Sequence, residues 1–125
     1  MPAFDRLVEI ADREVCGCRD RLPAPLIEHA RALPVSYESA PNDDIIDEGF
    51  EPDLLGLFVG GAYADDAGHD SVPLPSQILL FLDNIWEYAE GSERVFRREV
   101  RKTYLHELGH YLGLDEEDLY ERGMD

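Results

Sequence analysis

The stretch HELGHYLGLDEEDL, His106 to Leu119, combines two histidines, a glutamate between them, a glycine and a run of acids. His106 and His110 lie four positions apart, and residues with this spacing in an α-helix lie on one face about one turn apart. Two imidazole nitrogens placed in this way can bind one zinc ion. Glu107 is displaced by about 100° around the helix axis, so its carboxylate can reach a water molecule on the metal rather than the metal itself. The pattern therefore predicts a helical metal site with Glu107 as general base.

Two histidines leave a zinc ion short of ligands, and the residues after Gly113 can supply the third. If the helix simply continued, Glu116 would lie roughly 9 Å along its axis beyond His110, too far to share the ion. Glycine reaches the left-handed conformation that ends helices, so the chain can turn at Gly113 and bring Asp115, Glu116 or Glu117 back toward the metal. With three protein ligands, the fourth position stays open for water, whose pKa a bound zinc ion lowers to about 7. Manganese or iron would accept the same ligands.

The length and charge of the chain limit the number of domains and the kinds of partner that we expect. The sequence has 125 residues, which fits a single domain over residues 1–125. Its 28 acidic residues against 11 basic ones give a formal charge of −17, which repels phosphate backbones and anionic lipid, so we expect neither nucleic acid nor a membrane as partner. The N-terminal segment has no apolar signal region, and Cys16 and Cys18 suit partly buried thiols in a reducing compartment. We therefore predict a cytoplasmic protein.

Hydrophobic periodicity predicts an α+β domain in which a small sheet is covered on one side by helices. We expect one helix from Phe4 to between Arg19 and Leu22, a second from Pro25 to Leu33, a short one capped by Asp83 or Asn84, and a long one from about Glu93 to Leu112, capped by Ser92. The expected strands are residues 35–38, 54–60 and 77–82. The acid-rich residues 41–53 are expected to form a surface loop.

These features resemble one family, the small bacterial zincin-like metallopeptidases, whose signature is H-E-x-x-H-x-x-G-x-x-E-E-D-L. The chain matches every specified position of this signature from His106 to Leu119. The resemblance includes LLGLF at residues 54–58 and ILLF at residues 78–81, and it covers most of the chain from the middle onward. It implies a minimal zincin fold, in which a few strands lie above the active-site helix. It also implies zinc held by His106, His110 and, among the three acids, Glu116.

The chain departs from larger zincin proteases after this signature. Only Leu114 to Asp125 follow the active-site glycine, so we expect no C-terminal subdomain to form the far wall of a substrate cleft. The spacing of residues in the sequence does not identify which residue would stabilise the oxyanion formed during hydrolysis. The candidates are Tyr104, Tyr111, Tyr120 and His69, for each of which we first expect a core or surface role.

Two functions from different classes fit these residues. The leading one is a zinc-dependent metallopeptidase that hydrolyses a peptide or an exposed protein segment, which could lie along an open edge of the strand ending at Leu82. The alternative is a non-catalytic, zinc-stabilised interaction module whose acidic surface binds a basic partner protein. We expect five bases before the motif to form a solvated, ion-paired face, with a patch for an acidic partner as the alternative: Arg94, Arg97, Arg98, Arg101 and Lys102. The oligomeric state stays open.

Overall fold

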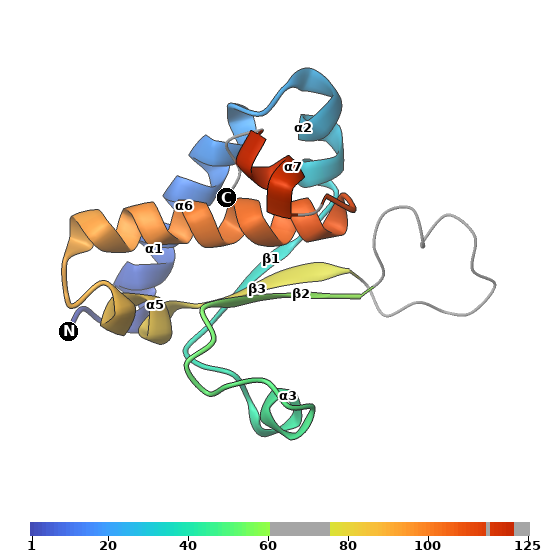
Figure 1. The fold of residues 1–125 in the computed structure, drawn as a ribbon. Helices are drawn as coiled ribbons and strands as arrows, with labels where there is room; N and C mark the ends of the chain where they lie inside the picture. The colour runs from blue at the N-terminus through green and yellow to red at the C-terminus, as the bar shows by residue number, and fades with distance from the viewer. Residues whose placement is uncertain (61–75, 115, 122–125) are drawn as a thin grey trace.

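The computed structural model combines a small sheet with helices and describes residues 1–60, 76–114 and 116–121, the last range without the side chains of Glu116, Leu119 and Tyr120. The elements follow in the order α1 (Phe4–Asp20), α2 (Ala24–Arg31), β1 (Val35–Glu38), α3 (Asp43–Asp47), β2 (Gly56–Val59), β3 (Gln77–Phe81), α5 (Leu82–Tyr88), α6 (Glu93–Tyr111) and α7 (Glu116–Glu121). Figure 1 shows the long helix α6 extending beside the strands of the sheet. The predicted α+β class is confirmed.

The two long helices α1 and α6 form because each has an apolar stripe at helical spacing. The stripe of α1 consists of Leu7, Ile10, Ala11, Val15 and Cys18, and that of α6 includes Phe96, Val100, Tyr104 and Leu108. Ser92 caps α6 as predicted, because its side chain accepts a hydrogen bond from the Val95 N–H at 3.3 Å. In the described part of the chain, no helix combines the length and the apolar content that crossing a membrane requires.

The sheet has the strand order β1-β3-β2. β3 pairs in parallel with β1, placing Val35 opposite Ile78, and antiparallel with β2, placing Phe58 opposite the same residue. The strand that ends before Leu82 is therefore central, and the prediction that it offers an open edge is wrong. Although β3 follows β2 along the chain, it inserts between β1 and β2, an arrangement that neighbouring residues do not encode. Of the two edge strands of the described sheet, β2 has the more extensive contact with α6.

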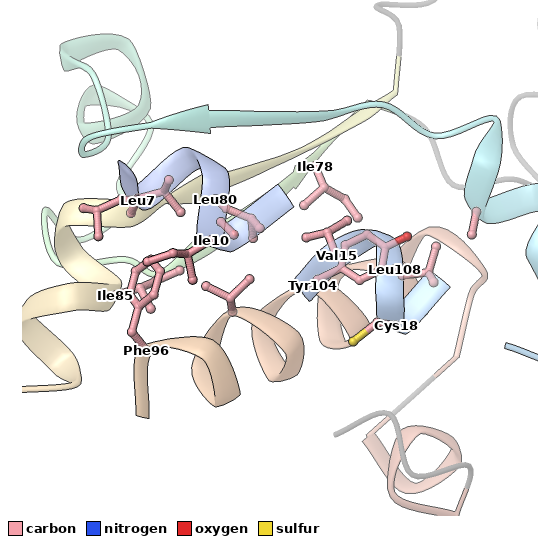
Figure 2. Close-up of a cluster of buried hydrophobic side chains, with 14 of the residues drawn as sticks. Leu7, Ile10, Val15, Cys18, Ile78, Leu80, Ile85, Phe96, Tyr104 and Leu108 are labelled. Atoms are coloured by element: carbon pink, nitrogen blue, oxygen red, sulfur yellow. The ribbon is translucent and has the colours of Figure 1, made fainter. Parts of the chain in front are cut away.

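The core lies between the sheet and the two long helices. Figure 2 shows side chains of α1, β3, α5 and α6 pointing into one cluster, in which Ile78 and Leu80 of β3 are 0% exposed. Gly56 of β2 lies opposite Leu80, and a Cβ atom at Gly56 would lie 2.5 Å from Cγ2 of Thr103 on α6. The missing side chain thus lets α6 approach β2 closely, which brings the C-terminal half of α6 beside the sheet edge.

A surface ion-paired cluster joins α1 to α6. Glu14 of α1 accepts hydrogen bonds from Arg97 at 3.2 Å and from Arg101 at 2.9 Å, and Arg98 pairs with Glu99 at 3.5 Å. Burial alone would raise the pKa of Glu14, but the hydrogen bonds and charges of the two guanidinium groups lower its pKa below the usual value. The predicted ion-paired face is confirmed for these three arginines, with a joining acid from α1 that the sequence did not indicate.

Two local predictions are wrong. Residues 41–53 are not wholly a loop, because α3 forms after Asn42, whose side chain accepts a hydrogen bond from the Ile45 N–H at 2.9 Å. This short helix buries no residue, so no apolar stripe could predict it. Neither Asp83 nor Asn84 caps α5, which starts at Leu82 without a side-chain cap. The Asn84 side chain instead donates to the carbonyl oxygens of Pro52 and Leu54, and so ties the segment before β2 to α5.

Candidate metal centre

His106 and His110 lie together on one face of α6, one helical turn apart. Their ring centroids are 4.7 Å apart and their planes are inclined at 81°, so the rings meet edge to face rather than stacked. With Glu107 they form a group whose ligand atoms all lie within 4.8 Å of one another. His106 and Glu107 are half-buried and His110 is exposed. The site is therefore open to solvent on the side of His110.

This donor set fits a zinc ion. Zinc accepts imidazole nitrogen and carboxylate oxygen at about 2.0–2.2 Å, and two ligands of a tetrahedral ion lie about 3.4 Å apart. Atoms within 4.8 Å of one another would need to approach by at most roughly 1.5 Å to share one ion, which side-chain rotation can provide. Two imidazoles four residues apart are thus placed to hold a metal, while a third ligand must come from elsewhere.

Glu107 is held by the edge of the sheet. The backbone N–H of Phe58 in β2 donates to Oε1 of Glu107 at 3.0 Å, and among the described residues Glu107 makes no second hydrogen bond or ion pair. Because this N–H points toward α6, it is directed away from β3. The sequence did not predict the contact, since its donor is a backbone group. The only local signal was Gly56, because a glycine inside a strand can mark a close approach of another segment.

The chain turns after the second histidine as predicted. Gly113 has φ +77°, and the N–H groups of Gly113 and Leu114 donate to the carbonyls of His110 and Gly109 at 3.1 and 2.9 Å, which is a Schellman motif. Figure 1 shows α7 starting just beyond this turn.

The predicted third ligand is not tested by this geometry. Glu116 begins α7, but its side chain lies outside the described residues, as does all of Asp115. The exposed Glu117 is described, and it is not a member of the group formed by His106, Glu107 and His110. The assignment of Glu116 as third ligand therefore stays a prediction.

A hollow of about 360 Å³ opens beside His106 and Glu107, between α6 and the segment that leads into β2. Its other lining residues are Leu54, Leu55, Gly56, Lys102 and Thr103. The volume falls in the lower part of the range for small-ligand sites. The candidate base thus borders a space that can accommodate part of a substrate.

The candidate oxyanion stabilisers are in the core where the structure describes them. Tyr104 is 0% exposed, burial raises its pKa to about 12, and its hydroxyl has no hydrogen-bond partner among the described residues. Tyr111 is 8% exposed, and its ring meets that of Phe58 edge to face at 5.5 Å. Of the core or surface role expected for these residues, both tyrosines have the core role. His69 and the Tyr120 side chain lie outside the described residues.

Comparison with known proteins agrees with this geometry. A family model described as zincin-like metallopeptidase matches residues 30–124. No curated protein matches the chain. The family match begins within α2, and so covers β1, β2, β3, α6 and the turn at Gly113. The segment ahead of the match is chiefly α1. By this match, the chain belongs to the zincin-like metallopeptidase family.

Proposed function

We propose that this protein is a zinc-dependent peptidase in which His106, His110 and Glu116 hold the ion and Glu107 is the general base. The observation that carries this proposal is the convergence of two imidazoles and a carboxylate on one helix face, beside a hollow that the same carboxylate borders. A purely structural zinc site would be closed by four protein ligands and would gain nothing from such a carboxylate. When bound, the ion would lower the pKa of a water molecule to about 7 and polarise the substrate carbonyl.

Glu107 would take the proton from the attacking water and pass it to the leaving amine. The Phe58 N–H holds Oε1 and so orients the carboxylate, while Oε2 has no hydrogen-bond partner among the described residues and can receive the proton. A carboxylate held in this way needs little reorganisation when the water attacks. The edge strand thus positions the base that the helix presents.

The substrate would be a peptide or an exposed protein segment in extended conformation. β2 is an edge strand, and its Phe58 N–H faces the site rather than β3. An extended chain laid along this edge would bring its own backbone next to Glu107. This replaces the strand ending at Leu82 as the expected docking edge.

The test compares the parent protein with Glu107→Gln. The glutamine side-chain oxygen can still accept the Phe58 N–H, so the fold and the metal should be retained while the base is lost. We expect about one zinc per chain in both proteins, removable by a chelator, and at least about a hundred-fold loss of peptide hydrolysis in the variant. Glu28→Gln, which removes the same charge from an exposed position on α2, should cleave like the parent. If Glu107→Gln cleaved as fast as the parent, Glu107 would not be the base.

The alternative of a non-catalytic zinc module gives a different result in the same experiment. No member of a peptide library would be cut, and Glu107→Gln would have no effect. Metal removal would instead lower thermal stability or the binding of a basic partner protein.

A further inference from the structure

Lys102 differs from the other bases of α6. It is the sole lysine of the chain. Arg97, Arg98 and Arg101 each lie within 4.0 Å of a glutamate carboxylate. In the part of the chain that the structure describes, the exposed Lys102 has no such partner. Its ammonium group is therefore not neutralised by a described neighbour and is available to another anion.

The position of Lys102 directs that charge to the candidate centre. Lys102 lies four residues before His106, so the two share a face of α6 one turn apart. Both line the hollow of about 360 Å³, whose opposite wall includes the half-buried side chains of Leu54 and Leu55. Arg94 is also exposed and without a described ion pair, but it does not line this hollow. The lining thus combines an aliphatic wall with one permanent cation.

The charges of the lining indicate what this cation could bind. The other ionisable residues of the hollow are His106 and Glu107, which the proposed peptidase uses as ligand and base. The chain as a whole has a formal charge of −17, which repels anions. The positive charge of Lys102 opposes this repulsion locally, beside the site. A lysine ammonium is a compact charge on a flexible stem and can follow an anion at several positions. A carboxylate next to an apolar side chain would match both parts of the lining.

We propose that this hollow is a substrate subsite in which Lys102 selects a peptide carboxylate and Leu54 and Leu55 contact the adjacent apolar side chain. This inference rests on the proposed peptidase function and narrows its substrate class. The carboxylate could belong to an internal glutamate or aspartate, or to the C-terminus of the peptide. Both sources present the same anion, and titration with peptides that contain only one of the two carboxylates separates them.

The expected preference is small because the ion pair would be solvent-exposed. Exposed pairs of this kind change affinity by about two- to five-fold, and salt screens them. The preference should therefore be measured at about 0.05 M ionic strength and should shrink when salt is raised to about 0.5 M.

Binding can be measured apart from turnover in the zinc-loaded Glu107→Gln protein. Selective ¹⁵N labelling of lysine gives one backbone signal, that of Lys102, because the chain has one lysine. The probes are three alanine-based hexapeptides. The first contains leucine followed by glutamate and has both ends blocked, and the second has glutamine in place of the glutamate. The third is the glutamine peptide with a free C-terminal carboxylate. Titrations are repeated with Lys102→Met, Lys102→Arg and Arg94→Met added to the Glu107→Gln background. The variants without Lys102 are labelled uniformly with ¹⁵N, and their other backbone amide signals report binding.

We expect either carboxylate peptide to bind about two- to five-fold more tightly than the neutral one, and the peptide that does so identifies the source. Lys102→Met should abolish this preference, whereas Lys102→Arg and the charge-matched control Arg94→Met should retain it. Equal binding of all three peptides, no binding of any of them, or a preference that survives Lys102→Met would overturn the subsite. If the parent protein hydrolysed no peptide while the binding preference was present, the result would instead count against the proposed peptidase.

Discussion

The turn at Gly113 can be tested by a single substitution, Gly113→Ala. Gly113 has φ +77°, and a Cβ atom there would meet nothing within 4 Å, so the cost comes from the backbone conformation rather than from a clash. An L-residue in this conformation loses about 1–2 kcal/mol, which for a chain of 125 residues lowers Tm by about 4–8 °C. Urea unfolding of the metal-depleted protein measures the loss directly. Zinc affinity should also fall, because the predicted third ligand lies beyond this turn.

Two other glycines provide controls for Gly113→Ala. Gly17 lies inside α1 with space for a Cβ atom, so Gly17→Ala should stabilise the protein by roughly 0.5–1 kcal/mol. Gly49 has φ +105° and open space around it, so Gly49→Ala should cost stability while leaving zinc affinity unchanged. A Gly113→Ala protein as stable as the parent would refute the account of the turn. Equal losses of zinc affinity in the Gly113 and Gly49 variants would refute the link between the turn and the metal.

Two further predictions concern the packing of α6. Glu14→Gln should cost roughly 1–2 kcal/mol at pH 7, because Arg97 and Arg101 lose a charged partner, whereas the exposed Glu9→Gln should cost less than about 0.5 kcal/mol. Since the folded pKa of Glu14 lies below its usual value of 4.5, this stabilisation is present above about pH 4.5 and is lost as the pH falls through the folded pKa, so urea melts of parent and variant should converge in acid. Tyr104→Phe removes a buried hydroxyl without a described partner and should leave stability unchanged or raise it, with hydrolysis unaffected; a clear loss of hydrolysis would contradict the core role.

The long helices could be predicted because their signals are local. An apolar stripe from Phe4 and a Ser92 cap before Glu93 each lie within a few residues of the element that they specify. The arrangement of the strands could not be predicted in this way. Insertion of β3 between two earlier strands depends on contacts between segments far apart in the sequence.

The same distinction between local signals and long-range contacts applies to the candidate site. His106, Glu107 and His110 come together because helical spacing alone places them on neighbouring positions of α6. The Phe58 N–H that holds Glu107, and the hollow beside it, arise where β2 packs on α6, so no motif in either segment reveals them. Gly113 marked the turn, but a turn residue alone does not fix the direction of the chain beyond it.

We expect His106, His110 and an acid beyond Gly113 to bind one zinc ion together. X-ray absorption at the zinc edge, recorded on the protein loaded with one equivalent of zinc, identifies these ligands. The spectrum should show two imidazole nitrogens at about 2.0–2.1 Å and oxygen ligands at about 2.0–2.2 Å, with one oxygen signal lost in Glu116→Ala. Failure to retain zinc, or a bound ion without two imidazole ligands, would contradict this expectation.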